Sequence, residues 1–187
     1  MILMKIYTKS GDEGETSLLR GGRLKKDDLR IELLGHLDEV QAWVGYLRST
    51  LGETHPREAL LITLQQSLFI LGAIVACPVH ERAQLKLPTW PSHLLGVLEV
   101  CIDEIEAQNA PLQNFLIPGP PQSSALAHLI RSQVRRCERC YVAAQKSHQD
   151  IEFPEGLKFL NRLSDFFFVL GREFSRVEGI PETLWIP

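Results

Sequence analysis

From Leu37 onward, apolar residues recur at spacings of three and four, which is the period of an α-helix with one buried face. Five stretches of the chain show this period. They are marked by Leu37, Val40, Val44, Leu47 and Leu51; by Leu61, Leu64, Leu68, Leu71 and Val75; by Leu95, Leu98, Ile102 and Ile105; by Leu126, Ile130, Val134, Cys137 and Tyr141; and by Leu160, Leu163, Phe167, Leu170 and Phe174. Glycines and prolines separate the stretches. The pattern predicts an all-α fold, an antiparallel five-helix bundle without a β-sheet.

Residues 1–30 lack this period and are rich in glycine, hydroxyl and basic residues. In the run YTKSGDEGETS, Gly11 and Gly14 would let backbone amides approach an anion. Hydroxyls come from Thr8, Ser10, Thr16 and Ser17, and positive charge comes from Lys9 and Lys26. The order of residues fits neither a Walker A loop nor a dinucleotide-binding fingerprint. We interpret this segment as a phosphate-binding loop, with a plain flexible arm as the alternative.

The fourth stretch contains the run RSQVRRCER, which places a charged stripe beside its apolar seam. The charged residues after Arg131 follow it by four, seven and eight positions; they are Arg135, Glu138 and Arg139. All four charged groups therefore share one surface of the helix. Guanidinium groups suit phosphate oxygens, and the excess positive charge favours an anionic ligand. The alternative is a solvated helix face on which Glu138 pairs with Arg135 or Arg131.

Polar residues elsewhere in the predicted helices carry weaker signals. Asn161 and Asp165 interrupt an apolar stretch one turn apart, and each needs partners, which could be Arg162, another helix or a ligand. Cys137 and Cys140 form a CERC pair without a second pair of suitable spacing, so we interpret all four cysteines as reduced thiols rather than zinc ligands. His128 and His148 are interpreted as ordinary polar residues.

Length and charge narrow the class of protein. A chain of 187 residues with 44% hydrophobic residues predicts one domain, with a loop over 1–30, a helical bundle over 31–178 and a tail over 179–187. The net charge of −3 provides no general attraction for nucleic acid or an anionic membrane. The chain shows neither a signal-peptide core nor an apolar run of about 20 residues. We therefore expect a cytoplasmic protein with no nucleic-acid or membrane partner.

Five motifs together carry a family resemblance: YTKSGDEGETS, LGHLDEVQAWVG (34–45), NFLIPG (114–119), RSQVRRCER (131–139) and FLNRLSDFFF (159–168). In this order they resemble the ATP-dependent corrinoid adenosyltransferases of the propanediol-utilisation type. The resemblance implies transfer of the 5′-deoxyadenosyl group of ATP, supplied with Mg²⁺, to cob(I)alamin. It also implies a homotrimer with the substrates at subunit interfaces. A cobalamin reductase, which would act on cob(II)alamin, and an adenosylcobalamin-dependent enzyme are possible partners.

The resemblance assigns individual roles. The triphosphate would be held by Thr8, Lys9, Ser10, Gly11, Thr16, Ser17 and Lys26, and the nucleotide site would be completed by Arg135, Arg136, Glu138, Arg139 and Asn161. Asp38 would pair with Arg131 across the interface, and Phe115 would press on the lower face of the corrin. These three residues would form the corrinoid site, and with Arg135 they would be the catalytic residues. No side chain is assigned as a direct metal ligand.

Two positions depart from the family pattern. Gln41 stands where the family usually has Asn, and Pro120 replaces the second glycine of IPGG. Pro120 removes an amide and fixes φ, so the loop behind Phe115 is expected to differ in shape. Two other functions remain open at this point. One is a chaperone or sensor that binds ATP or adenosylcobalamin without turnover, and the other is a helical interaction module without a ligand.

Overall fold

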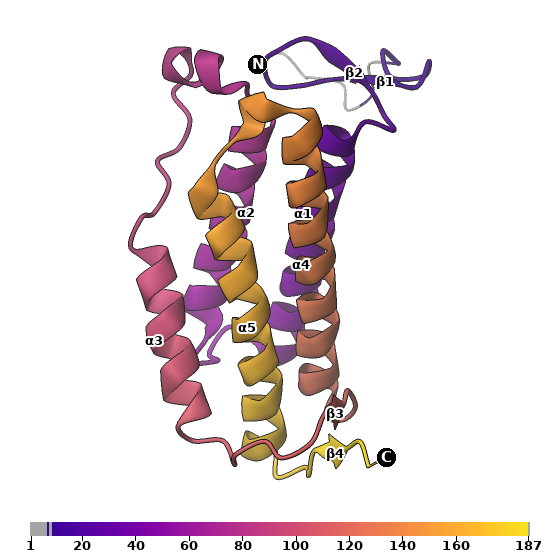
Figure 1. The fold of residues 1–187 in the computed structure, drawn as a ribbon. Coiled ribbons are helices and arrows are strands. Elements are labelled where there is room, and N and C mark those ends of the chain that lie inside the picture. The colour runs from indigo at the N-terminus through magenta and orange to yellow at the C-terminus, as the bar shows by residue number, and fades with distance from the viewer. Residues whose placement is uncertain (1–6, 8, 187) are drawn as a thin grey trace.

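The computed structural model describes residues 7 and 9–186, and within them five helices form an elongated antiparallel bundle (Figure 1). They are α1 (Leu29–Leu51), α2 (Glu58–Val75), α3 (Leu94–Glu106), α4 (Gln122–Ser147) and α5 (Pro154–Val177). Helix α4 packs against α1 and α5, α3 packs against α5, and α2 packs against α1. The predicted all-α bundle is confirmed.

The first helix begins at Leu29, earlier than the apolar pattern indicated. The reason is local chemistry. Asp28 caps the helix, because its side chain accepts a hydrogen bond from the backbone N–H of Arg30 at 2.8 Å. Arg30 is itself buried in the first turn, although an arginine leaves no apolar mark in the sequence.

The core lies along the seam between α4 and the other long helices. Ile130, Val134 and Tyr141 of α4 are fully buried, as are Leu160 and Phe167 of α5. The extended segment before α3 closes one side of this core, since Trp90 packs edge-on against both Phe153 and Phe159, with ring centroids 5.3 Å apart in each pair. Burial of this apolar surface supplies the main driving force for the fold.

Two short antiparallel sheets correct the prediction of no β-sheet. Strand β1 (Glu15–Ser17) pairs with β2 (Arg23–Lys25) in the N-terminal region, and β3 (Leu116–Ile117) pairs with β4 (Thr183–Leu184) at the other end of the bundle. Strands of two or three residues are too short for an alternating pattern to be visible in the sequence. The second sheet also joins segments that are far apart along the chain.

Two 3-10 helices complete the end of the bundle that lies near β1 and β2 in Figure 1. They are η1 (Val79–Gln84), which follows α2, and η2 (Gln149–Ile151), which joins α4 to α5. Helix α2 is long and apolar enough to cross a membrane by composition, but the core helix of a bundle meets the same criterion. Its residues Leu61, Leu64 and Leu68 belong to the bundle core.

The start of α5 lies close to Leu71 of α2 and Tyr141 of α4, which leads to a stability prediction at Gly156. A Cβ at this position would lie 2.6 Å from Leu71 Cδ1 and 3.3 Å from the Tyr141 hydroxyl. We expect Gly156→Ala to destabilise the fold by about 1–3 kcal/mol, because overpacking outweighs the helix propensity of alanine. The midpoint of chemical denaturation at a fixed protein concentration measures the effect.

Gly96 in α3 is the matched control, because a Cβ there would meet nothing within 4 Å. Gly96→Ala should stabilise the protein by about 0.5–1 kcal/mol. If both variants shift the midpoint in the same direction, the packing explanation is wrong.

Candidate functional site

In the N-terminal hairpin, residues 9–27, the glycine-rich turn lies beside the end of the returning strand β2. The backbone N–H of Lys26 donates to the carbonyl of Gly14 at 2.8 Å, and that of Gly14 donates to the carbonyl of Gly11 at 3.3 Å. A Cβ on Gly11 would lie 3.4 Å from the Lys26 Nζ, so the ammonium lies directly beside this turn. Gly14 has a φ of 80°, a conformation that glycine adopts without strain.

The other predicted phosphate-binding residues are placed around this turn. Lys9, Ser10 and Lys26 are exposed. The Ser10 carbonyl accepts a hydrogen bond from the Arg23 guanidinium at 2.7 Å, which ties the turn to β2. Thr16 is half-buried and Ser17 exposed on β1. The predicted role of Thr8 lies outside the described residues.

The tip of the hairpin rests on the end of α2. The backbone N–H of Arg20 donates to the carbonyl of Ala76 at 3.3 Å. Gly21 has a φ of 88°, and a Cβ there would lie 2.7 Å from the Pro78 Cγ. The hairpin is therefore held by the bundle at its tip as well as by the chain that continues into α1.

Three arginines in the middle of α4 are exposed and lack acidic partners. Within residues 9–186, Arg135, Arg136 and Arg139 make no ion pair, and all three side chains are exposed. Cys140, the next residue, contacts the carbonyl of Leu29 at 3.8 Å, so this part of α4 lies against the first turn of α1. The exposed cations near this contact therefore lie on the same helix, close to the start of α1, which follows the hairpin.

Glu138 pairs with α5 instead of with the arginines. Its Oε1 accepts a hydrogen bond from the Asn161 Nδ2 at 3.1 Å, while the Asn161 Oδ1 accepts one from Arg162 at 3.2 Å. Arg162 also contacts Glu99 at 2.9 Å and Asp165 at 3.5 Å. The alternative in which Glu138 neutralises Arg131 or Arg135 is therefore wrong for this structure, and Asp165 pairs with Arg162.

A separate apolar cavity lies at the end of the bundle where β3 and β4 pair. It has a volume of about 680 Å³, and its lining includes Phe115, His128, Arg131, Phe168 and Trp185. Phe115 is 80% exposed at its edge. The Phe115 carbonyl accepts a hydrogen bond from the backbone N–H of Trp185 at 2.8 Å, and the two rings meet edge-on with centroids 6.5 Å apart. The cavity is large enough for part of a large planar ligand.

Two polar side chains in the wall of this cavity are desolvated. Burial, aided by the charge of Arg131, lowers the pKa of His128 to about 4, so the imidazole is neutral at pH 7. Burial, followed by the nearby charge of Arg135, lowers the pKa of Arg131, although a guanidinium stays protonated. The Arg131 Cζ lies 6.0 Å from the centre of the Phe168 ring, a cation–π distance.

Asp38 and Arg131, which were expected to pair across subunits, lie in different places on the protomer. Asp38 is exposed on α1 and borders a groove of about 340 Å³ formed with Phe69 and other residues of α2. Gln41 lines the same groove. Arg131 faces the cavity that holds Phe115. A single protomer therefore does not bring the two side chains together.

Sequence patterns missed three residues of the cavity wall. His128 was interpreted as an ordinary polar residue, but it is buried on α4, where its ring packs against Phe168 of α5. Phe168 and Trp185 carried no signal of their own, since one sits among core phenylalanines and the other is an isolated aromatic in the tail. A large aromatic residue in a short C-terminal tail is the only feature that could have marked Trp185.

The cysteines behave as buried thiols. Cys77, Cys101 and Cys137 are buried, and desolvation raises the pKa of each thiol. All four cysteines are free of disulfide bonds. Across the described part of the chain there is no group of three or more His, Cys, Asp or Glu residues that could hold a metal ion.

Comparison with known proteins identifies the family of this chain. The family model described as "Cobalamin adenosyltransferase" matches residues 6–174. The chain is 39% identical over 180 residues to the corrinoid adenosyltransferase of Bacillus subtilis. The aligned region covers 95% of this chain and 90% of that protein. It is 35% identical over 170 residues to the corrinoid adenosyltransferase of Citrobacter freundii, with coverage of 91% and 94%.

Solved structures agree over the same length. A phenylalanine-to-alanine variant of the PduO-type ATP:corrinoid adenosyltransferase from Lactobacillus reuteri, complexed with cobalamin and ATP, matches with a TM-score of 0.90 and 32% identity. That match covers 98% of this chain and 100% of the other. By its sequence and by its fold, the chain therefore belongs to the cobalamin adenosyltransferase family.

Proposed function

We propose that this chain transfers the 5′-deoxyadenosyl group of ATP to the cobalt of cob(I)alamin, giving adenosylcobalamin and triphosphate. One observation carries the proposal. A chain that matches this family over residues 6–174 also has, on one protomer, a cationic glycine-rich hairpin and an apolar cavity edged by Phe115. The relative from Lactobacillus reuteri, which shares the fold, is complexed with both cobalamin and ATP.

On the nucleotide side, we assign the triphosphate to the hairpin and the α4 stripe. Lys26 beside the Gly11 turn supplies an ammonium next to backbone amides, as phosphate oxygens require. Thr8, Lys9, Ser10, Thr16 and Ser17 are assigned to the same site from their motif. Arg135, Arg136 and Arg139 supply charge without a competing acid, and Glu138 with Asn161 joins α4 to α5 behind them.

In this reaction, these residues position the two reactants and stabilise the charge on the leaving group. Cob(I)alamin is itself a strong nucleophile, so the cobalt electron pair forms the bond to C5′ while the C5′–O bond breaks and its electrons leave on the triphosphate. Immobilising both reactants removes much of the entropic barrier. Lys9, Lys26 and Arg135 stabilise the negative charge that grows on the leaving group. The transfer needs no general base.

Mg²⁺ belongs in this scheme with the ATP substrate. No cluster of metal-ligating side chains exists in the described residues, so phosphate oxygens and water are the ligands that suit it. It would neutralise part of the triphosphate charge when bound.

Phe115 is assigned to the lower face of the corrin. Reduction of cob(II)alamin to cob(I)alamin becomes easier once the lower axial ligand leaves, and an exposed aromatic ring at the edge of an apolar cavity can exclude both water and the benzimidazole base. The Phe115 backbone is held by its bond to Trp185. Pro120, the departure from the family pattern, lies just beyond β3 and so does not interrupt the pairing at Leu116 and Ile117.

A homotrimer completes the proposal. Helix α2 is apolar but only 39% of its residues are buried, and its Phe69 is 70% exposed beside the Asp38 groove. An apolar face of this kind favours covering by another protomer. Association would allow Asp38 of one protomer to reach Arg131 of the next, which a single protomer does not permit.

A cytoplasmic location and a cobalamin reductase as electron donor are further parts of the proposal.

An anaerobic assay with ATP, Mg²⁺ and chemically reduced cobalamin tests the function. The spectral change that accompanies formation of the cobalt–carbon bond should appear together with one triphosphate per adenosylcobalamin. A chaperone or sensor would bind either ligand without releasing triphosphate. An interaction module would show no thermal stabilisation by ATP, so each alternative has a distinct result.

We expect Arg135→Ala to lower turnover and weaken ATP binding by about ten- to a hundredfold, because one charge-assisted contact is worth about 1.5–3 kcal/mol. Its exposed side chain makes no ion pair within residues 9–186, so helical content and oligomeric state should not change. Steady-state kinetics and circular dichroism measure both effects. Lys146→Ala, which removes an exposed cation from the last turn of the same helix, should keep wild-type kinetics. Wild-type kinetics in Arg135→Ala would refute its role.

For Asp38 and Arg131 we expect energetic coupling across the interface. Each single change to alanine should impair corrinoid use, and the double variant should be less damaging than the sum by about 0.5–3 kcal/mol. The cycle is read from kcat/KM for cob(I)alamin. The control cycle pairs Arg131→Ala with Asp103→Ala, an exposed acid on α3, and should be additive. Strict additivity for Asp38 and Arg131 counts against the pair.

For Phe115→Ala we expect a loss that depends on the oxidation state supplied. Activity from cob(II)alamin with a mild reductant should fall steeply, because water or the base can reach the lower face of cobalt. Activity from cob(I)alamin prepared beforehand should fall much less. Spectra of the ATP complex give a direct check. A variant that forms four-coordinate cob(II)alamin to the wild-type extent would remove Phe115 from this role.

A further inference from the structure

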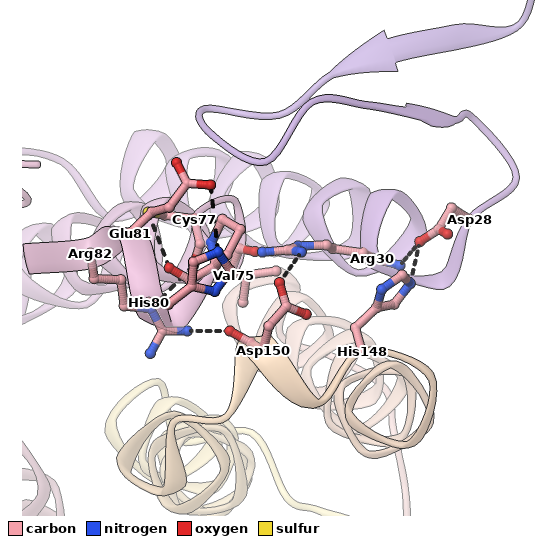
Figure 2. A network of polar contacts seen from close by, with 10 residues as sticks. Asp28, Arg30, Val75, Cys77, His80, Glu81, Arg82, His148 and Asp150 are labelled. Atoms are coloured by element: carbon pink, nitrogen blue, oxygen red, sulfur yellow. Dashed lines mark hydrogen bonds and ion pairs between the residues drawn. The ribbon is translucent and has the colours of Figure 1, made fainter. Parts of the chain in front are cut away.

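Arg30 joins the beginning of α1 to the end of α2. Its side chain is 3% exposed, and its Nε donates a hydrogen bond of 2.6 Å to the carbonyl of Val75, the last residue of α2 (Figure 2). The last carbonyls of a helix have no donor within the helix. Helix α2 has no basic residue in its own last turn. Arg30 therefore supplies both the missing donor and the positive charge that a helix C-terminus favours.

A wider network holds the Arg30 guanidinium in place. Its Nη1 donates to the Asp150 Oδ2 of η2 at 2.9 Å. From η1, Arg82 donates to the carbonyl of Cys77 at 3.2 Å and to that of Asp150 at 3.4 Å. His148, which ends α4, lies 2.8 Å from the Asp28 Oδ1 that caps α1. Figure 2 shows these side chains converging from separate segments of the chain.

The N-terminal hairpin is attached to the same two helix ends. On one side, Lys26 lies two residues before the Asp28 cap, and the Asp28 N–H donates to the carbonyl of Lys25 at 3.1 Å. On the other side, Arg20 bonds to Ala76 and Gly21 lies against Pro78, directly after α2. The position of the hairpin therefore depends on how the start of α1 sits relative to the end of α2.

We propose that Arg30 is a positioning residue for the nucleotide. By fixing the start of α1 to the end of α2, it holds the Lys26 ammonium and the Gly11 turn in the arrangement that receives the triphosphate. Arg30 is buried below the hairpin and acts through these backbone attachments, not through contact with ATP. The nucleotide part of this inference rests on the proposed function, while the mechanical part concerns the hairpin alone.

Two substitutions of Arg30 separate position from charge. Arg30→Met removes both contacts, and Arg30→Lys keeps the charge but offers a compact ammonium that cannot reproduce the fork to Val75 and Asp150. We expect Arg30→Met to raise KM for ATP about tenfold and Arg30→Lys to raise it less, because misplacing a binding group weakens the contact without removing it. The KM for cob(I)alamin should stay within about twofold, since the Phe115 cavity lies at the other end of the bundle. The kcat should fall, because a displaced Lys26 also stabilises less of the charge that grows on the leaving triphosphate.

Amide hydrogen exchange without any ligand provides a second measurement. The amides of Leu18, Arg20 and Lys26 are hydrogen-bonded within or beneath the hairpin, so they should exchange faster in both Arg30 variants. The amides of β3 and β4 should be unchanged. Wild-type exchange in the hairpin together with a wild-type KM for ATP would overturn the proposal.

Arg57→Met is the matched control for general loss of stability. Arg57 lies at the opposite end of α2 and bridges to Glu173 of α5 at 2.8 Å and 3.2 Å, so it joins two helices as Arg30 does. This variant should lose stability while keeping both the wild-type KM for ATP and wild-type exchange in the hairpin. An equal rise of KM in Arg57→Met would show that general destabilisation, not positioning, explains the effect.

The remaining outcomes are also decisive. If Arg30→Met does not fold, Arg30→Lys and Asp150→Asn carry the test, because Asp150 is partly exposed and asparagine keeps an acceptor for Arg30. Asp150→Asn should raise KM for ATP less than Arg30→Lys does. If the wild-type protein neither binds ATP nor turns over, the proposed function fails, and hydrogen exchange alone still decides whether Arg30 fixes the hairpin.

Discussion

The packing of α4 between α1 and α5 is the constraint on which the rest of the structure depends. Ile130, Val134 and Tyr141 must face the core, and the geometry of a helix then dictates where the intervening residues point. Arg135 and Arg139 are exposed to solvent, and Arg131 lines the cavity near Phe168. The same residues that bury the seam thus decide the position of the cations.

The protomer separates two chemical environments along this helix. At the hairpin, Arg23 pairs with Glu15, but Lys9 and Lys26 are exposed and make no ion pair within residues 9–186, which suits a highly charged leaving group. Near β3 and β4, the cavity is apolar, and burial keeps His128 neutral. A reaction between a polyphosphate and a large, largely apolar macrocycle needs both environments. The protein provides them at different levels of one bundle, and the homotrimer proposed above would bring them together at a subunit interface.

Charge pairing distinguishes the structural residues from those available for a ligand. Arg30, Arg57 and Arg172 are bonded to acids or carbonyls and hold helices together. Buried or partly buried cations need such partners, because desolvation is costly. Arg135 and Arg136 remain exposed to solvent and can exchange water for phosphate at little cost. This contrast is visible only once the contacts of each side chain are known, since the sequence shows arginine in every case.

Sequence alone determined the elements that rest on local periodicity and on contiguous motifs. The five helices, the glycine-rich loop and the charged stripe of α4 were all predictable, because the burial of a helix face repeats every three to four residues and the loop chemistry lies within one short run. The early start of α1 escaped prediction, since its buried first-turn residue is Arg30 and its cap is a single aspartate.

Only the tertiary structure decided the contacts between distant segments. The pairing of β3 with β4, the placement of Trp185 against Phe115, and the attachment of the hairpin to Ala76 all join residues far apart in the chain. The bond from Arg30 to Val75 and the separation of Asp38 from Arg131 belong to the same class. The physical reason is that such contacts depend on how the helices are arranged in space. A single backbone bond or ring contact leaves no periodic trace in the sequence.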